Sequence, residues 1–329
     1  MAKHPITREA QGLRRGTRPS EQVRRHRVAE AVRSERPVRP PPALHAPAAR
    51  PRRRAPVRAA PRLVHPMLGA REPGYVEQLM PLFGALSDLY YRAEAAGTEH
   101  LSDRASLIVS THNGGAALPD TIAFLVAWHR RFGAQAPLHG LVHKIVLRLP
   151  GLRTMVPKLG GLPASHESGQ AVLTADRPLL VMPGGDLDAL KPFRERHTVT
   201  FGPRRGFIRL ALRNQVPIVP VVSVGAHETF LVLNDGRWLA KLSGLERLMR
   251  VKTVPLALSF PFGLTLAGVP SIPLPSKIKM KVLPPIELHE KRTAAEDPRV
   301  VERCFEHVRA TMQRELDALA AGRKRLLLG

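Results

Sequence analysis

The sequence predicts an α/β domain, with a mainly parallel central sheet flanked by helices, after a basic low-complexity segment. From residue 67 onward, short apolar runs alternate with longer segments of helical periodicity, which is typical of parallel strands joined by crossover helices. Residues 1–66 differ, because Arg, Pro and Ala dominate them and they hold 11 of the 32 prolines. We therefore expect a disordered tail over 1–66 and one domain over 67–329.

Composition and charge narrow the protein class. The 329 residues are 43% hydrophobic, enough for one large domain with a sizeable core. The net charge is +24, and the first 66 residues carry 17 Lys and Arg against 4 Asp and Glu. The single cysteine, Cys304, excludes an internal disulfide framework. The longest uncharged run, 253–276, contains five prolines, so we expect no membrane-spanning helix there, and residues 1–66 show no secretory signal.

The first predicted elements lead to a glycine turn. Apolar residues recur at helical spacing over 75–90, where Pro81 is expected to kink an amphipathic helix. The apolar face of that helix is expected to join the core, with contact to lipid as the alternative. A buried strand over 106–110 follows, and a turn over 111–115 leads into a helix over 118–132.

The later elements continue the alternation. We expect strands over 179–182, 216–222 and 278–283 and a helix over 206–213. A C-terminal helix should begin at Asp297, a good N-cap residue followed by Pro298 at the first helical position.

A histidine and an aspartate flank the glycine turn. His112 follows the strand at 106–110, and ligands of open α/β sheets bind beyond the carboxyl ends of strands. Gly114 and Gly115 allow a tight turn that could fold the carboxylate of Asp120 back onto the imidazole. An imidazole oriented by a carboxylate is a general base for a hydroxyl. The alternative is a loop histidine and a helix-capping aspartate.

Several blocks in the same order resemble the glycerolipid acyltransferases, the family that includes the lysophosphatidate acyltransferases. Within it, the chain is most similar to the bacterial branch related to diacylglycerol-type acyltransferases. The resemblance covers about residues 91–286, and its blocks are residues 92–97, 109–120, 159–165, 180–186, 205–212, 216–220 and 225–228.

This resemblance implies a catalytic pair, His112 and Asp120, and direct transfer of an acyl group from acyl-CoA or acyl carrier protein to a lipid hydroxyl. The thioester is a co-substrate, so no cofactor and no metal is expected. Backbone N–H groups at Gly114 and Gly115 are expected to hold the developing oxyanion. Seven residues separate His112 from Asp120, where the family more often has four.

Two further departures concern the acyl acceptor. Phosphate-handling relatives normally carry an arginine in the second block and a glutamate in the third, whereas this chain has Ser165 and Gly184. A neutral or unusual acceptor is therefore favoured over lysophosphatidate.

The remaining candidate residues are expected to bind substrate. An acceptor-side wall is predicted from a proline, two glycines and an aspartate, namely Pro183, Gly184, Gly185 and Asp186, with an ordinary turn as the alternative. Arg205 precedes a predicted helix start, where it could bind a phosphate or remain a solvated surface residue. Glu228 is a candidate too, although a structural hydrogen-bonding role is favoured. His139 and His143 have zinc-helix spacing, but no third ligand is evident.

The predicted partners are the acyl thioester, the lipid acceptor and an anionic membrane surface. The basic charge and the apolar segment 254–275 favour a peripheral or monotopic protein on the cytoplasmic side of a membrane. That segment could instead be buried irregular core. A non-catalytic lipid-binding relative and a basic nucleic-acid-binding protein remain alternatives, and the aromatic content of 5% counts against the second.

Overall fold

The computed structural model describes residues 66–234, 236, 255–266 and 272–323. All of them belong to one compact unit, Ala59–Gly329. The tail predicted over 1–66 lies outside the described residues, apart from Pro66.

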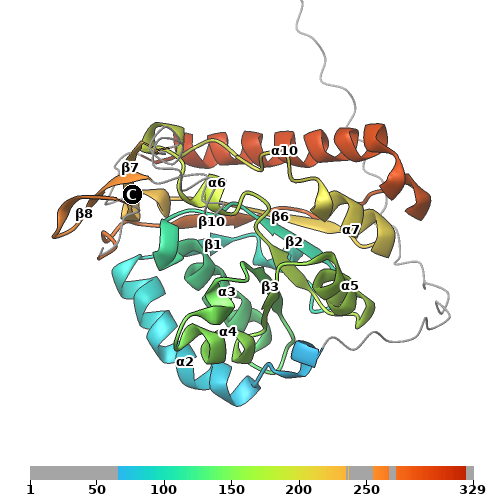
Figure 1. The fold of residues 1–329 in the computed structure, drawn as a ribbon, viewed down its shortest axis with the longest axis horizontal. Coiled ribbons are helices and arrows are strands. Elements are labelled where there is room, and N and C mark those ends of the chain that lie inside the picture. Colours follow the sequence, from blue (N-terminus) through green and yellow to red (C-terminus); the bar gives the residue numbers. More distant parts are fainter. Residues whose placement is uncertain (1–65, 235, 237–254, 267–271, 324–329) are drawn as a thin grey trace, which may run out of the picture. The chain divides into compact units, whose positions relative to one another are not determined.

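A seven-stranded sheet forms the centre of this unit (Figure 1). Its spatial order is β1-β10-β6-β2-β5-β3-β4. Five neighbouring strands run parallel, whereas β10 is antiparallel to β6 and β1 is parallel to β10. The mainly parallel α/β sheet that the sequence predicts is therefore confirmed. The bounds are Glu94–Ala96 for β1, Leu107–Ser110 for β2, His139–Val142 for β3, Gly161–Pro163 for β4, Leu179–Val181 for β5, Ile218–Val224 for β6 and Lys279–Val282 for β10.

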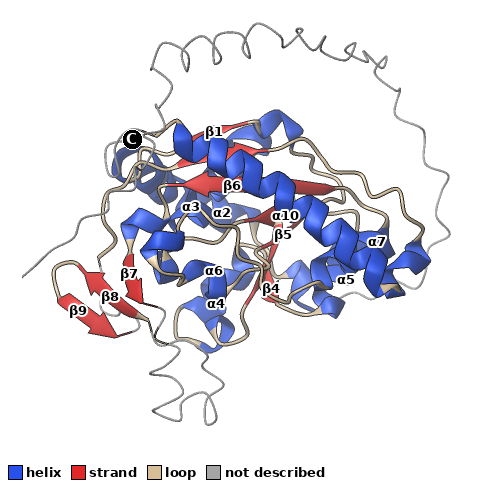
Figure 2. Ribbon diagram, turned by 90° about the horizontal axis from the view of Figure 1, so that it is seen from above, coloured by secondary structure: helices blue, strands red, loops and turns tan. Residues whose placement is uncertain are grey.

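Helices cover both faces of the sheet, which explains why its central strands are apolar throughout (Figures 1 and 2). Successive side chains of β2 point to opposite faces, so Leu107 and Val109 enter one core cluster and Ile108 enters the other. One face packs against three helices, α5 (His166–Thr174), α7 (Gly206–Asn214) and α10 (Pro298–Ala321). The opposite face packs against α3 (Pro119–Phe132).

Helix α2 (Pro73–Ala85) packs outside α3 and continues through Pro81 into a π-helical turn over Leu86–Tyr90. Val76 and Met80 are buried in a small cluster, as the predicted core contact requires. Leu82 and Leu89 of the same apolar periodicity are instead exposed, so the predicted stripe is only partly buried. The shorter helices are α4 (Leu152–Lys158) and α6 (Asp186–Ala189).

A second, three-stranded antiparallel sheet follows β6 in the chain, with the order β7-β8-β9. Its strands are Leu231–Asn234, Leu256–Ser259 and Gly263–Leu266. The apolar, proline-rich segment 254–275 therefore contains a β-hairpin rather than buried irregular core. Residue 254 and residues 267–271 of that segment lie outside the described residues.

Helix α10 is anchored to the domain by an aromatic cluster. Asp297 caps its first turn by accepting from the N–H of Arg299 at 2.9 Å, as the sequence predicts. The Phe305 ring then packs on the rings of Phe201 and Phe207, with centroids 6.2 and 5.9 Å away. These buried contacts join the C-terminal helix to α7 and to the segment that precedes it.

Removing the Phe305 ring should therefore destabilise the domain. We expect Phe305→Ala to lower the free energy of unfolding by about 3–5 kcal/mol, because the core loses a buried aromatic ring and retains a cavity. Urea unfolding followed by circular dichroism measures the loss. The control is Glu306→Ala on the exposed face of the same helix, expected within about 0.5 kcal/mol of the wild type. Equal losses in the two variants would contradict the proposed anchoring role.

Candidate active site

Three of the predicted motif blocks meet at one edge of the sheet. Strands β6, β2 and β5 are adjacent and parallel, so their carboxyl ends lie side by side. His112 follows β2, the turn at 183–185 follows β5, and residues 225–228 follow β6. The sheet topology thus assembles the site from segments that lie at least 40 positions apart in the sequence.

The turn after β2 returns the Asp120 carboxylate to the His112 ring. Imidazole Nδ1 and carboxylate Oδ1 are 4.0 Å apart. Gly114 and Gly115 adopt left-handed φ values of 82° and 59°. A Cβ at Gly114 would lie 2.4 Å from Pro119 Cγ and 2.7 Å from the carbonyl oxygen of Ala226, so only glycine fits there. This compact turn spans the seven-residue interval between the two side chains.

The Asp120 carboxylate is fully buried and held by backbone amides. Oδ2 accepts from the N–H of Asn113 and Oδ1 from the N–H of Thr121, both at 2.7 Å. Burial raises the pKa of Asp120 to about 6, although the adjacent His112 and both amides favour the ionised form. Asp120 also lies in the first turn of α3, where the helix dipole favours negative charge.

The His112 imidazole lies at the boundary between core and solvent. Its side chain is 16% exposed, while Nδ1 is buried without a hydrogen-bond partner. Solvent therefore reaches the ring elsewhere than at Nδ1, the atom that faces Asp120. A proton on Nδ1, directed at the carboxylate, leaves Nε2 with a free lone pair. This arrangement suits a general base, and the 4.0 Å separation is of the loose kind found in catalytic pairs without substrate.

A buried ion pair fixes the backbone of His112. Asp188 Oδ2 accepts from the His112 N–H at 2.7 Å, and Asp188 Oδ1 accepts from Lys191 Nζ at 2.7 Å. The same ammonium donates to the Thr198 carbonyl at 2.7 Å. The Asp188 and Lys191 side chains are 0% and 2% exposed. Neither residue was predicted from the sequence. The one signal there is that Asp188 lies close to the Pro-Gly-Gly turn.

A buried polar cluster supports the opposite side of the turn. The Thr111 and Ser223 hydroxyls are 3.4 Å apart, and Asn113 Nδ2 donates to Ser223 Oγ at 3.3 Å. Ser223 belongs to β6, so these contacts tie the His112 segment to its neighbouring strand. The sequence gives no local signal for this pairing, because the residues are more than 100 positions apart.

The Pro-Gly-Gly turn is closed by the side chain of Arg204. Arg204 Nη1 donates to the carbonyls of Pro183 and Gly184, and Nη2 donates to Asp186 Oδ1 at 2.6 Å. A Cβ at Gly184 would lie 2.3 Å from Asp188 Cβ, so the turn packs directly on the residue that holds His112. Pro183, Gly184, Gly185 and Asp186 therefore form a rigid turn adjoining the site.

Arg205 and Glu228 make structural contacts. Arg205 forms a bidentate ion pair with Glu302, and its guanidinium lies over the Phe305 ring. A guanidinium neutralised in this way is a poor site for a free phosphate, so the predicted anion-binding role finds no support. Glu228 is buried and accepts from Arg323 Nη1 at 2.9 Å. The favoured prediction for Glu228, a structural hydrogen-bonding role, agrees with this contact.

The two histidines with zinc-helix spacing, His139 and His143, differ in their environments. His139 is buried in β3, with ring nitrogens 3.2 Å from the Gly160 carbonyl and 3.1 Å from Arg177 Nη1. Burial, and then Arg177, lowers the pKa of His139 to about 4. His143 is exposed. Among the described residues, no group of three His, Cys, Asp or Glu side chains could hold a metal ion.

A separate, small pocket of about 20 Å³ lies between α2 and α3. Val76 and Met80 line one wall, and Leu125 and Trp128 line the other. Trp128 lies eight residues along α3 from Asp120, about 12 Å of helix. The lining contains no residue of the His112 turn.

Comparisons with known proteins agree with this picture. The family of diacylglycerol acyltransferases matches residues 133–296. An uncharacterized protein of Mycobacterium tuberculosis is 32% identical over 252 residues, which are 76% of this chain and 67% of that protein. Diacylglycerol O-acyltransferase 2B of Umbelopsis ramanniana is 27% identical over 208 residues, covering 58% of this chain and 56% of that protein.

One solved structure is also similar. The crystal structure of the 1-acyl-sn-glycerophosphate (LPA) acyltransferase PlsC from Thermotoga maritima aligns with a TM-score of 0.49 and 16% identity, over 77% of this chain and 83% of that chain.

The fold is that of an α/β protein with a candidate acid–base pair at the carboxyl edge of its parallel strands. The sequence matches place the chain in the class of glycerolipid acyltransferases. The chain belongs to the diacylglycerol acyltransferase family. Within the described residues, no helix is both long and apolar enough to span a bilayer.

The buried ion pair under His112 gives a stability prediction. Asp188→Ala leaves the buried Lys191 ammonium without its counter-ion, so we expect a loss of about 3–5 kcal/mol in the free energy of unfolding. The double variant Asp188→Leu, Lys191→Met removes both charges and should recover most of that loss. Urea unfolding measures both variants, with exposed Asp317→Asn as the control. A double variant as unstable as Asp188→Ala would contradict the argument.

The raised pKa of Asp120 predicts a pH dependence. The native carboxyl titrates near pH 6 against an ordinary value of 3.8, so the native state binds more protons than the unfolded state between pH 4 and 6. The Asp120 contribution to the free energy of unfolding therefore falls as pH rises through this window, by up to about 3 kcal/mol.

Asp120→Asn removes this titration. The wild type minus variant difference in the free energy of unfolding, measured in urea from pH 4 to pH 8, should decrease with rising pH and level off above pH 6. A difference that stays constant or increases with pH would show that the pKa of the Asp120 carboxyl is not raised.

Proposed function

We propose that this protein is an O-acyltransferase that moves a fatty acyl group from a thioester to a lipid hydroxyl in glycerolipid synthesis. The observation that carries the proposal is the accessible His112 ring facing the buried Asp120 carboxylate, in a chain of the diacylglycerol acyltransferase family. The donor is acyl-CoA or acyl carrier protein. We assign the activity to residues 67–329, which form the acyltransferase domain.

In the proposed reaction, His112 acts as a general base. Its Nε2 takes the proton of the acceptor hydroxyl as the oxygen forms a bond to the thioester carbonyl carbon. The C–S bond then breaks, and the departing sulfur takes the proton back from the imidazolium as a free thiol. Asp120 stabilises the imidazolium and keeps Nδ1 protonated. The products are an ester and the thiol of the carrier, and no covalent enzyme intermediate forms.

The oxyanion is assigned to the backbone of the glycine turn. Gly114 and Gly115, two and three positions after His112, both have left-handed backbone conformations. Backbone N–H groups in such a turn are fixed before the reaction, so they can stabilise charge that develops on the carbonyl oxygen.

A neutral acceptor fits the acceptor side of the site. Gly184 has no space for a side chain, because its Cβ would lie 2.4 Å from the carbonyl of Thr200. Ser165 caps α5 by accepting from the N–H of Ser168 at 3.0 Å. Asp186 and Arg204 pair with one another at 2.6 Å. The positions that carry charge in phosphate-handling relatives are thus occupied by structural residues, which favours an acceptor such as a mono- or diacylglycerol.

The proposed location is the cytoplasmic face of a membrane, with the protein bound peripherally or monotopically. An acceptor with long acyl chains resides in the bilayer, and the net charge of +24 favours contact with anionic lipid.

Substitution of His112 tests the catalytic assignment. His112→Ala should lower the rate of ester formation by about 10²–10⁴-fold, because the general base is lost. Liquid chromatography and mass spectrometry follow ester formation from oleoyl-CoA and a panel of monoacylglycerol, diacylglycerol, lysophosphatidate and long-chain alcohol. His143→Ala, an exposed histidine outside the site, serves as the matched control.

Unchanged turnover in folded His112→Ala would exclude the assignment. Ester formation from none of the acceptors by the wild type would favour a non-catalytic lipid-binding relative.

A further inference from the structure

The outer face of the small β7-β8-β9 sheet has the reverse of the usual polarity. Antiparallel sheets with one solvated face normally turn polar residues outward. Here Leu258 of β8 pairs with Leu264 of β9, and both point outward with about half or more of their surface exposed. Ala257 and Ser259 point inward and are buried. Even the Ser259 and Thr265 hydroxyls bond to one another, at 2.6 Å.

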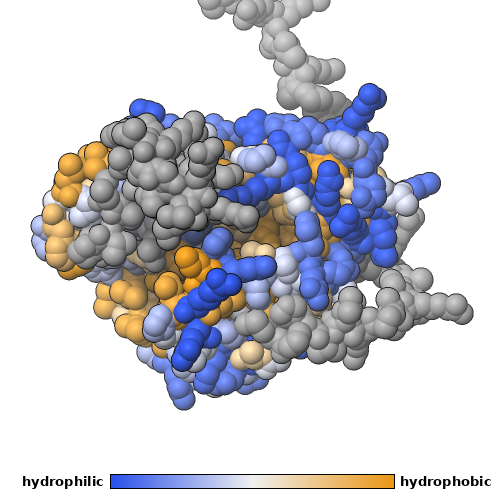
Figure 3. Space-filling model, in the orientation of Figure 1, coloured by the Kyte–Doolittle hydropathy of each residue, from blue (hydrophilic) through white to orange (hydrophobic). Residues whose placement is uncertain are grey.

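Large apolar side chains cover this face and the tip of the hairpin. Each is between 47% and 61% exposed: Leu233, Leu258, Phe260, Phe262, Leu264 and Ile272. The three strands and the β8–β9 turn contain no charged residue. Figure 3 shows the resulting apolar surface on the left side of the molecule, where Figure 1 places β7 and β8. Monomeric soluble proteins rarely expose so many large apolar side chains together.

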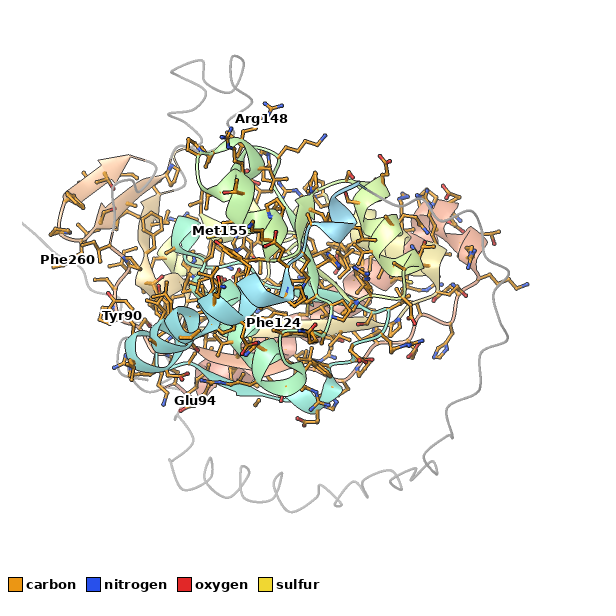
Figure 4. All side chains as sticks on the ribbon, turned by 90° about the horizontal axis from the view of Figure 1, so that it is seen from below. Tyr90, Glu94, Phe124, Arg148, Met155 and Phe260 are labelled. Carbon is orange, nitrogen blue, oxygen red and sulfur yellow. The ribbon has the colours of Figure 1, made fainter. Side chains whose placement is uncertain are left out.

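The apolar face, defined by these six side chains, continues toward the π-helical turn Leu86–Tyr90. The N–H of Ile272 donates to the Phe260 carbonyl at 2.9 Å, and the Tyr90 hydroxyl donates to the neighbouring Pro273 carbonyl at 2.5 Å. Leu89, next to Tyr90, is 79% exposed. Figure 4 shows Tyr90 and Phe260 on the same side of the molecule.

The inner face of the same sheet rests on the candidate active site. Phe230, which precedes β7, packs with Val232, Ala257 and Leu190. A Cβ at Gly115 would lie 3.1 Å from the Phe230 ring. The sheet is therefore only one layer of side chains away from the glycine turn that follows His112.

Basic residues lie on an adjoining side. Lys144, Arg148 and Arg153 are exposed around α4 and the short 3₁₀-helix η5 (Val146–Arg148), and within the described residues none of the three forms an ion pair. Ile145 and Leu149 are exposed among them. Figure 4 shows Arg148 at the upper margin and Phe260 at the left margin, so the basic and apolar surfaces flank one corner of the molecule. Apolar side chains beside cations are the combination that anionic bilayers bind.

We propose that the apolar face of the β7-β8-β9 sheet inserts into a phospholipid bilayer and thereby presents the His112 site to lipid acceptors. The inference rests on the proposed function in one respect, because the lipid acceptor that docking brings to the site is part of that proposed function. A second copy of the chain is a poorer occupant, since two molecules of net charge +24 repel one another.

Vesicle binding by the full chain tests the docking. Sucrose-loaded vesicles of phosphatidylcholine, and of phosphatidylcholine with 30% phosphatidylglycerol, are sedimented with protein in 0.1 and 0.5 M NaCl. Phe260→Ser, Phe262→Ser should weaken partition into pure phosphatidylcholine at least about tenfold, at both salt concentrations, because the loss is apolar. The matched control is Leu82→Ser, since Leu82 is 57% exposed against 59% for Phe260. Far-ultraviolet circular dichroism confirms that the variants are folded.

A measurement of insertion depth tests the docking even if the serine substitutions impair folding. Phe260→Trp should gain fluorescence that brominated phosphatidylcholine quenches, relative to the wild type, whereas Leu82→Trp should gain fluorescence that is not quenched. Failure of quenching at position 260, or equal weakening in Leu82→Ser and the Phe double variant, would overturn the proposal. So would light scattering that shows a dimer dissociated by the Phe substitutions with vesicle partition unchanged.

Failure of docking and failure of the proposed function are distinguishable. His112→Ala should bind vesicles as the wild type does, so its binding reports on docking alone. The Phe double variant should keep its turnover of a monomeric short-chain acceptor but lose turnover of diacylglycerol embedded in vesicles. If His112→Ala stays active, the catalytic assignment fails, and the quenching result still decides the docking.

Discussion

The buried carboxylate of Asp120 is the constraint on which the rest of the site depends. A carboxylate without solvent is stable only if donors compensate for its lost hydration. The chain supplies two backbone N–H groups from either side of the same turn, so the carboxylate also fixes the conformation of that turn. Each carboxylate oxygen accepts from one of the amides, and Oδ1 also lies 4.0 Å from His112 Nδ1, so the fixed turn holds the negative charge beside the imidazole.

The second constraint is the sheet, which brings separate loops to this turn. Neither Asp188 nor Ser223 forms a hydrogen bond to the His112 ring, yet Asp188 accepts from the His112 N–H and Ser223 binds the residues on either side of His112. Parallel pairing of β6, β2 and β5 makes these contacts possible, because it places three carboxyl ends at one edge. A one-residue change of register would turn inward-facing residues to the other face and dismantle the network.

The sequence alone reveals features with local signatures. His112, the glycines and Asp120 were predictable because turn residues, helix start and strand end all lie within 15 positions. The short strands β1, β3 and β4 were not predicted, since charged, histidine, glycine or proline residues interrupt the apolar runs that mark the equally short β2 and β5. Arg204 and Arg205 are adjacent, and only tertiary contacts decide that Arg204 closes the Pro-Gly-Gly turn while Arg205 anchors α10. Lys191 likewise shows its role only through its burial beside Asp188.

The proposed function and the proposed bilayer docking together explain the paired charges beside the site and the apolar face of the small sheet. The neutral, water-insoluble acceptor that we propose requires a site without free charge and a path from the bilayer to His112. Paired charges at Asp186 and Arg204 satisfy the first need. An apolar sheet that packs on the His112 turn through Phe230 satisfies the second. The reversed polarity of β8 and β9 costs free energy in water, because Leu258, Phe260 and Leu264 remain hydrated. That cost becomes a binding free energy when the same side chains enter lipid.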